Sequence, residues 1–220
     1  MSTIQSDFDR ITLVSPDGSL HNDHYHNFLL RQLRSRCHSA LEVGCGKGEF
    51  SRRLAERSDR VLALDLSPEM ISIARERLAP LPNIDFELVD VMQRDLPAES
   101  FDCIASIATL HHLPLREILL KMKAALKPDG VLLILDLFEP RGLADTFLNP
   151  LAVGLSGTLR LVHHRRLLPS REARDAWAIH ETHDLYPTMN DVRQLCADIL
   201  PGASVRKHLL WRYSAVWRKN

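Results

Sequence analysis

The strongest constraint on the fold is an alternation of two kinds of segment through the middle of the chain. From about residue 40 to about residue 137, short apolar runs typical of buried strands alternate with stretches whose apolar residues recur at helical spacing. Consecutive parallel strands need a crossover connection, which a helix supplies. The alternation therefore predicts a doubly wound α/β fold, with a mostly parallel sheet covered by helices on both faces.

Individual elements follow from the apolar pattern and from the residues that begin and end helices. Ser67 with Pro68, Asp23 and Thr188 each fit the start of a helix, and residues 127–130, with the sequence KPDG, are expected to form a turn. The expected strands cover 40–43, 60–64, 84–89, 102–107, 131–137, 205–210 and 213–218, the last two as an antiparallel hairpin. The expected helices cover 23–36, 49–57, 68–78, 114–126 and 189–199.

The size and charge of the chain limit the functions that it can have. Its 220 residues suffice for a single α/β domain, and its 28 basic and 28 acidic side chains leave no net formal charge. A general nucleic-acid-binding protein usually carries a basic excess, so the composition speaks against nucleic acid as a partner. A monomer or a homodimer is expected.

Nothing in the sequence suggests a membrane or an export route. No apolar stretch approaches the roughly 20 residues that cross a bilayer, and the first ten residues, MSTIQSDFDR, are too polar for a signal peptide. The cysteines at positions 37, 45, 103 and 196 form no CxxC pair. We therefore expect free thiols in a cytoplasmic protein.

A glycine-rich turn, LEVGCGKGEF over residues 41–50, follows the first expected strand. A phosphate-binding P-loop requires GxxxxGK[ST], but here Gly46 is followed by lysine and then by Gly48. A dinucleotide fingerprint requires GxGxxG, which Gly44 and Gly46 begin and Glu49 breaks. The carboxylate of Glu49 would also oppose a pyrophosphate at a helix N-terminus. Neither phosphate-binding solution therefore fits the turn.

The remaining pattern, ExGxGxG from Glu42 to Gly48, resembles motif I of the class I S-adenosylmethionine-dependent methyltransferases. The resemblance continues through VLALD and SPEMI, LVDVMQRDLP, FDCIASIATLHHLP and LKPDGVLLILD, in the family's order and spacing, as far as Asp136. Within the superfamily the chain is similar to the type-11 group of bacterial small-molecule methyltransferases. The resemblance implies a Rossmann-like methyltransferase fold with a seven-stranded sheet whose last strand is antiparallel.

The resemblance also implies how the methyl donor, S-adenosylmethionine, binds before it leaves as S-adenosylhomocysteine. The glycine backbone would pass beside the amino-acid portion of the donor. Asp65 would accept hydrogen bonds from the ribose hydroxyls, and Asp90 would bond the adenine amine. The implied donor-binding residues are Glu42, Gly44, Cys45, Gly46, Gly48, Asp65, Leu66, Met70, Asp90, Val91 and Ile107.

Several of these residues also have a purely structural interpretation. Glu42 can tie down the glycine loop instead of contacting the donor, and Asp65 can simply precede a helix. Met70 can be an ordinary core residue, and Asp90 a loop residue. Cys45 lies between two glycines, where its small size is expected to matter more than its nucleophilicity.

Two further segments are expected to enclose the acceptor. The resemblance implies that an N-terminal helix, about residues 20–36, acts as a lid, so that Tyr25 either reaches the donor or acceptor with its hydroxyl or simply packs. Residues 138–187 break the alternation and are too long for a simple crossover. We interpret them as an acceptor cap inserted into a single domain that spans residues 1–220. The histidines around Tyr25 lack the spacing of a metal site, so no metal is expected.

His111 and His112 follow the fourth expected strand, where the acceptor should meet the methyl group. A neutral imidazole near physiological pH can take a proton from a hydroxyl or an amine. A base is needed only where the nucleophile does not readily lose its proton. The two histidines are therefore candidates for a general base or for a pair that shapes the acceptor site.

A local basic cluster lies within the expected cap. It can hold a carboxylate or phosphate of the acceptor, contact RNA, or form a solvated helix face. The cluster consists of Arg160, Arg165, Arg166, Arg171 and Arg174 beside His163 and His164. An RNA-binding surface would extend it to Arg206, Lys207, Arg212, Arg218 and Lys219. From the same cap, His180, His183, Asp184 and Tyr186 can close over the acceptor.

The sequence therefore predicts an enzyme that transfers a methyl group from S-adenosylmethionine to a small molecule. Apolar residues between positions 147 and 155 favour an apolar or aromatic acceptor. The alternatives are an RNA-modifying methyltransferase and a non-methylating S-adenosylmethionine-binding protein of the same fold. The target atom is left open among oxygen, nitrogen, sulfur and carbon.

Overall fold

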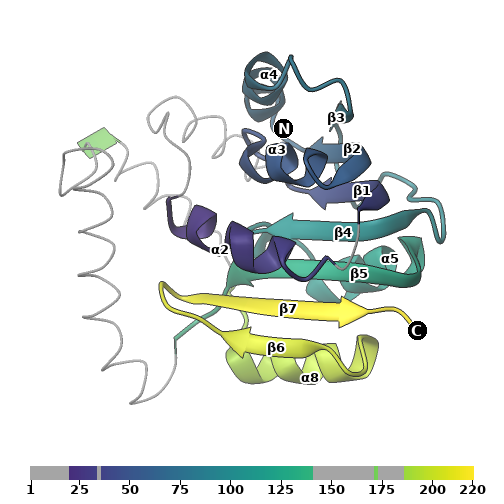
Figure 1. The fold of residues 1–220 in the computed structure, drawn as a ribbon. Coiled ribbons are helices and arrows are strands. Elements are labelled where there is room, and N and C mark those ends of the chain that lie inside the picture. The colour runs from purple at the N-terminus through teal and green to yellow at the C-terminus, as the bar shows by residue number, and fades with distance from the viewer. Residues whose placement is uncertain (1–19, 34–35, 141–170, 173–185) are drawn as a thin grey trace.

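The computed structural model of the protein describes residues 20–33, 36–140, 171–172 and 186–220. Its centre is a seven-stranded sheet with the order β3-β2-β1-β4-β5-β7-β6 (Figure 1). The strands are β1 (Cys37–Val43), β2 (Ser58–Asp65), β3 (Ile84–Leu88), β4 (Phe101–Ile107), β5 (Leu126–Leu137), β6 (Ser204–Lys207) and β7 (Arg212–Arg218). The helices are α2 (Leu20–Leu30), α3 (Glu49–Ala55), α4 (Pro68–Arg77), α5 (Leu115–Ala125) and α8 (Met189–Ile199), with a 3-10 turn η1 (Leu110–His112).

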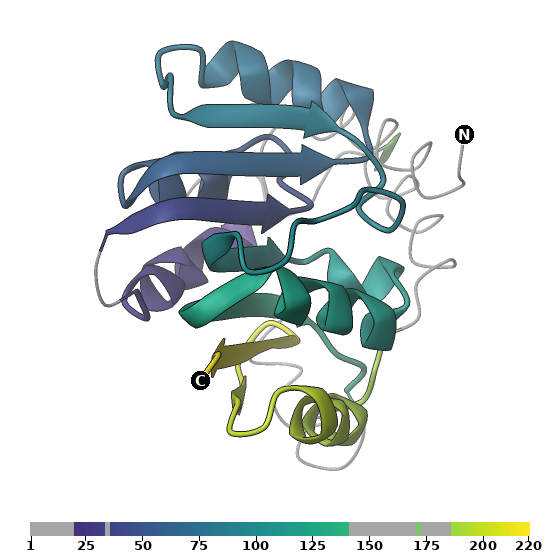
Figure 2. The ribbon, with the colours of Figure 1, turned by 90° about the vertical axis from the view of Figure 1, so that its right-hand side faces the viewer.

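The sheet has the predicted mixed topology. Strands β1 to β5 pair in parallel, whereas β7 is antiparallel to both β5 and β6. Helices α2, α3 and α4 bury apolar side chains on one face of the sheet, and α5 and α8 bury theirs on the other. Figure 2 shows the three layers from the side. The doubly wound seven-stranded fold predicted from the sequence is confirmed.

The largest errors in the predicted boundaries concern α2 and β5. The first helix ends at Leu30 rather than near residue 36, and Asp23 lies inside its first turn rather than at its cap. Residues 127–130 do not form a separate turn but a bulge within β5, where the register shifts between Phe101 and Cys103. The bulge residues remain hydrogen-bonded, because Asp129 N–H donates to the carbonyl of Lys219 at 2.7 Å. This pairing keeps the segment in the sheet.

The order of the strands fixes where a ligand can bind. Along the chain the sheet first grows outward from β1 through β2 to β3, and then continues on the other side of β1 with β4. Ligands of open α/β sheets bind beyond the carboxyl ends of the strands at such a switch point. The glycine loop follows β1 and the two histidines follow β4, so both lie at this point.

None of the helices in the described ranges is long and apolar enough to cross a membrane.

Helix α8 begins with a capping box that the sequence predicted only in part. Asp191 N–H donates to Thr188 Oγ1 at 3.2 Å, and Thr188 N–H donates to Asp191 Oδ2 at 3.0 Å. Two amide groups that the helix leaves without partners are thereby bonded. The buried side of α8, formed by Val192, Cys196 and Ile199, then packs on the sheet under β7.

We expect Thr188→Ala to lower the free energy of unfolding by about 1 kcal/mol, because it removes the side-chain half of the cap. In a chain of this size the melting temperature should fall by roughly 2–4 °C. Urea denaturation and thermal melts measure both quantities. Thr188→Ser keeps the hydroxyl and serves as the control. Equal stability of the alanine variant would show that the capping box contributes nothing.

Candidate active site

The glycine loop is held to the end of the neighbouring strand by backbone hydrogen bonds. The N–H groups of Gly44 and Cys45 both donate to the carbonyl of Leu64 in β2 at 2.9 Å. The loop then turns back, with Gly48 N–H bonded to the carbonyl of Cys45. Gly44, Gly46 and Gly48 all have positive φ angles, of 74°, 53° and 82°, which side chains disfavour.

The three glycines differ in what surrounds them. A Cβ atom on Gly44 would lie 2.0 Å from Thr109 Oγ1, and one on Gly48 would lie 2.7 Å from Leu78 Cδ1. A Cβ atom on Gly46 would meet no atom of the described residues within 4 Å, apart from its neighbours in the chain. Protein packing therefore accounts for the absence of a side chain at Gly44 and Gly48, whereas the space beside Gly46 is not taken up by the described residues. The contact of all three glycines with a ligand stays a prediction.

The carboxylate of Asp65 connects this loop to the next element. Its Oδ2 accepts a hydrogen bond from Gly46 N–H at 2.7 Å, and its Oδ1 accepts one from Ser67 N–H at 2.9 Å. Ser67 in turn caps α4, as the sequence predicted, by accepting from Met70 N–H. Each carboxylate oxygen can accept more than one hydrogen bond. Half-buried Asp65 can therefore anchor the loop and still bind a ligand.

The second predicted acid lies beside the first. Asp90 follows β3, the neighbour of β2, and the carbonyl of Asp65 accepts a hydrogen bond from Val89 N–H at 2.9 Å. The Oδ1 atom of Asp90 accepts from Met92 N–H at 2.8 Å, which gives the following turn its shape. Val91 is 7% exposed and its side chain belongs to the core, so only its backbone is available to a ligand.

The remaining predicted donor residues vary in accessibility. Leu66, Met70 and Ile107 are half-buried at the carboxyl edge of the sheet. Cys45 is buried, and that burial, with the nearby Asp65 carboxylate, raises the pKa of its thiol well above the usual value. A thiol with a raised pKa is a poor nucleophile, which agrees with a role for Cys45 as a small side chain.

Glu42 lies below the loop and is 2% exposed. Ser51 Oγ of α3 donates a hydrogen bond to Glu42 Oε2 at 2.5 Å. Burial, followed by the negative charges of Glu49 and Asp65, raises the pKa of Glu42 from its ordinary value of 4.5 to about 8. Of the two interpretations of Glu42, the geometry favours the one in which it ties β1 to the helix after the loop.

The structure gives His111 a partner that the sequence reasoning missed. His111 Nδ1 lies 2.5 Å from Asp136 Oδ1, and its backbone N–H donates to Asp136 Oδ2 at 3.0 Å. Asp136 is 1% exposed near the end of β5. The signal was present in the sequence, because VLLILDL places one acid at the end of an otherwise apolar strand. A carboxylate on Nδ1 fixes the orientation of the imidazole and leaves Nε2 to act.

Two aromatic rings lie beside His111, and Tyr25 is bonded elsewhere. The rings of His112 and Tyr186 lie 3.8 and 5.1 Å from the ring of His111. Tyr25 of α2 donates its hydroxyl proton to the carbonyl of Leu209 at 2.9 Å. This bond anchors α2 to the hairpin between β6 and β7. The catalytic role suggested for Tyr25 stays a prediction.

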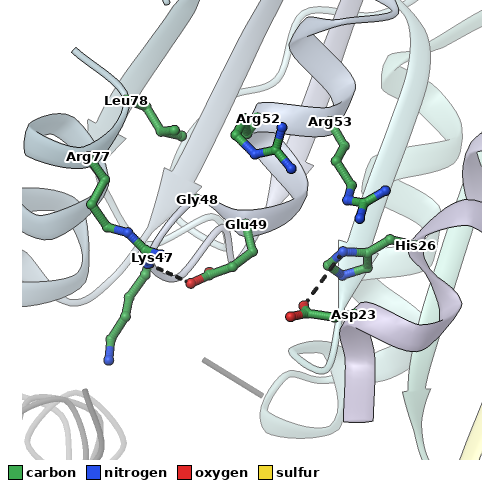
Figure 3. A pocket seen from close by; sticks show the side chains of 9 residues that line it. All are labelled: Asp23, His26, Lys47, Gly48, Glu49, Arg52, Arg53, Arg77 and Leu78. Atoms are coloured by element: carbon green, nitrogen blue, oxygen red, sulfur yellow. Dashed lines mark hydrogen bonds and ion pairs between the residues drawn. The ribbon is translucent and has the colours of Figure 1, made fainter. Parts of the chain in front are cut away.

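A separate basic pocket lies on the outer side of the glycine loop, between α2, α3 and α4 (Figure 3). Its volume is about 320 Å³. Its charged lining consists of Lys47, Arg52, Arg53 and Arg77 with the acids Asp23 and Glu49. His26 lies in the same wall, and burial, with smaller contributions from Arg53 and Arg52, lowers its pKa to about 4. Asp65 and Asp90 do not line this pocket.

Most of the residues predicted to contact the acceptor from the cap lie outside the described part of the chain. They are Arg160, Arg165, Arg166, Arg174, His163, His164, His180, His183 and Asp184. The proposed RNA-binding surface is wrong at Arg212, which is only 6% exposed. Among the residues whose positions are described, no group of three or more histidine, cysteine or acidic side chains could hold a metal ion.

The sequence of the chain is similar to the sequences of known methyltransferases. Residues 40–130 match the model of a methyltransferase domain family. Over 201 residues the chain is 28% identical to an uncharacterized methyltransferase of Mycobacterium tuberculosis, an alignment that covers 90% of this chain and 95% of that protein. Over 94 residues it is 38% identical to the malonyl-[acyl-carrier protein] O-methyltransferase of Serratia marcescens, covering 42% of this chain and 36% of that protein.

Among solved structures, the fold is similar to the N-methyltransferase NodS from Bradyrhizobium japonicum, which was determined in complex with S-adenosylhomocysteine. The TM-score is 0.67 at 18% identity, and the alignment covers 99% of both chains. At that identity the likeness concerns the fold alone.

The raised pKa of Glu42 predicts a pH dependence of stability. Between about pH 5 and pH 8 the unfolded chain loses the Glu42 proton while the folded chain retains it. The contribution to the free energy of unfolding is therefore full at low pH and is lost as pH rises, at up to about 1.4 kcal/mol per pH unit. Glu42→Gln cannot ionise, so its stability should fall less between these pH values. Urea titrations at each pH measure the difference.

Glu76→Gln, on the exposed side of α4, is the matched control and should keep the wild-type slope. A wild-type slope in Glu42→Gln would contradict the raised pKa.

Proposed function

We propose that this chain, a class I S-adenosylmethionine-dependent methyltransferase, transfers the methyl group of that donor to a small-molecule acceptor. The observation that carries the proposal is the open space at Gly46 beside the Asp65 carboxylate, at the switch point of the sheet. A ligand can approach the backbone closely there, because no described residue beyond its chain neighbours would meet a Cβ on Gly46. When bound, the donor supplies an electrophilic methyl group on a sulfonium.

The donor would lie across the carboxyl ends of β1, β2 and β3. We assign its ribose hydroxyls to Asp65, whose oxygens can accept further hydrogen bonds. We assign its adenine to the neighbourhood of Asp90 and the backbone of Val91, and its amino-acid portion to the loop at Gly46. These roles are supported by the bonds that bring the ends of β2 and β3 together with the glycine loop.

His111 is the proposed general base, with Asp136 as its positioning residue. The bond from Nδ1 to Asp136 selects the tautomer whose Nε2 can take a proton from an acceptor hydroxyl or amine. The second contact, from the His111 N–H to the same carboxylate, holds the backbone against β5. A role in shaping the acceptor site without proton transfer remains the competing assignment for the pair His111 and His112.

The acceptor would be enclosed by α2 and by residues 138–187 in their proposed roles as lid and cap. The hydrogen bond from Tyr25 to Leu209 holds α2 against the hairpin that borders β5. This contact supports the proposal that α2 acts as a lid. A small molecule is favoured over RNA, because Arg212 of the proposed basic surface is buried. Among the relatives, the enzyme of Serratia marcescens is named for malonyl-[acyl-carrier protein], which agrees with a small acceptor group.

Asp65→Ala should weaken the binding of S-adenosylmethionine and S-adenosylhomocysteine at least about tenfold, because one charge-assisted hydrogen bond is worth roughly 1.5–3 kcal/mol. Isothermal titration calorimetry on wild type and variant measures the change. Asp85→Ala, on an exposed position of β3, is the matched control and should bind normally. Undiminished binding by Asp65→Ala would remove the ribose assignment. Tight donor binding without any methylated product would favour the non-methylating alternative.

His111→Asn should lower the rate of methyl transfer by about 10²–10⁴ if the imidazole is the base, with donor affinity unchanged. Donor carrying a labelled methyl group, incubated with an extract of the source organism, identifies the product to be followed. His24→Asn, on an exposed position of α2, is the control. A rate within about threefold of wild type would leave only the shaping role.

A further inference from the structure

Arg212 is a buried cation at the carboxyl edge of the sheet. It opens β7 opposite Leu137 of β5 and is 6% exposed. Its Nε donates to Asn22 Oδ1 and its Nη1 donates to the carbonyl of Leu210, both at 2.8 Å. A guanidinium has five N–H groups, so these two bonds leave most of its donors unused. Within the described ranges Nη2 has no hydrogen-bond partner, and it is not one of the fully buried polar atoms.

The carboxylate with the strongest electrostatic effect on Arg212 already accepts hydrogen bonds from other residues. Asp136 is the acid whose field acts on the guanidinium most strongly, ahead of Tyr25 and Tyr186. Both oxygens of Asp136, however, accept hydrogen bonds from His111, and Oδ1 also accepts from Leu137 N–H. No carboxylate in the described part of the chain forms a salt bridge with Arg212. A buried charge without a close counter-ion is costly unless another group compensates it.

The guanidinium and the proposed base lie at the same edge of the sheet. Asp136 lies in β5 one residue before Leu137, the partner of Arg212, and it binds His111 of the segment after β4. Tyr186 joins the two, because its ring is 5.1 Å from that of His111 and its hydroxyl is within the electrostatic reach of Arg212. A ligand bound at His111 would therefore lie at the same edge of the sheet as the buried guanidinium of Arg212.

The turn before Arg212 holds the side chain in place. Leu210 and Trp211 adopt positive φ angles of 59° and 57°, which residues other than glycine rarely do. Through this turn the carbonyl of Leu209 faces the Tyr25 hydroxyl and the carbonyl of Leu210 faces Arg212. Strained backbone of this kind persists where the surrounding structure maintains it, often at functional sites. The guanidinium is therefore preorganised by α2 on one side and by the turn on the other.

We propose that Arg212 binds an oxyanion of the acceptor, a carboxylate or a phosphate, and so selects an acidic small molecule for methylation. The planar fork of a guanidinium matches either group with two parallel hydrogen bonds. The acceptor supplies the counter-ion that Arg212 lacks among the described residues, while its methyl-accepting atom lies toward His111. This inference rests on the proposed function, because the oxyanion site is useful only beside a bound methyl donor.

The test measures binding of matched probes to the protein saturated with S-adenosylhomocysteine. Benzoate and phenyl phosphate are compared with benzamide, which has the same ring and no charge, by isothermal titration calorimetry. Wild type should bind at least one of the two anions about tenfold or more tightly than benzamide, the worth of one charge-assisted pair. Which anion binds better distinguishes a carboxylate acceptor from a phosphorylated one. Equal affinity for all three probes, or no anion binding, overturns the proposal.

Three variants separate recognition from structure. Arg212→Met should lose the preference for anions, and Arg212→Lys should keep the charge but weaken the preference because it lacks the fork. Asn22→Ala removes the bond between α2 and Nε and leaves the other nitrogens in place, so it should retain the preference. If Asn22→Ala loses the preference for anions while the two Arg212 variants keep it, Arg212 has a structural role and does not bind the anion.

The affinity for S-adenosylhomocysteine distinguishes a failure of the proposed function from a failure of the role proposed for Arg212. If wild type does not bind S-adenosylhomocysteine, the proposed function fails. If it binds S-adenosylhomocysteine and does not prefer the anions over benzamide, only the role of Arg212 fails. The wild-type comparison needs no substitution, so it decides the question even if Arg212→Met does not fold.

Discussion

The carboxylate of Asp65 is the interaction on which the rest of the site depends. One oxygen holds Gly46 of the loop after β1, and the other holds Ser67 at the start of α4. Two segments that follow different strands are thereby fixed against a single side chain. The open space at Gly46 exists because the loop is held back in this way, with the carbonyl of Leu64 securing its first residues.

The segment after β4, where we propose that the acceptor binds, is held in the same way. Asp136 near the end of β5 binds the backbone and the ring of His111, which follows the neighbouring strand β4. In a parallel sheet the carboxyl ends of all strands meet at one edge, so an acid at the end of one strand can reach the loop after the next. Two acids, each one strand away from the loop that it holds, set the two halves of the site.

Two buried ionisable groups near this edge have different roles: one stabilises the scaffold, and we propose that the other binds a ligand. Glu42 is held neutral by burial over much of the pH range and ties β1 to α3. Arg212 keeps its charge without a close counter-ion in the described structure. Groups of this kind are common at functional sites, where a perturbed environment is part of the chemistry. Glu42 ties two elements of the scaffold together, and we propose that Arg212 uses its remaining N–H groups to bind a ligand.

The alternation of apolar runs determined the sheet, its helical layers and the hairpin at its end, because periodicity is a local property that tertiary contacts seldom reverse. The spacing of Glu42, the glycines and Asp65 likewise predicted that these residues lie at the carboxyl ends of β1 and β2, as the structure shows, and the donor site at that edge stays a prediction. Three features could not be predicted from the sequence. They are the hydrogen bond between His111 and Asp136, the burial of Arg212, and the different surroundings of Gly44 and Gly46. They join residues far apart in the sequence, and only the register of β4, β5 and β7 decides which of those side chains meet.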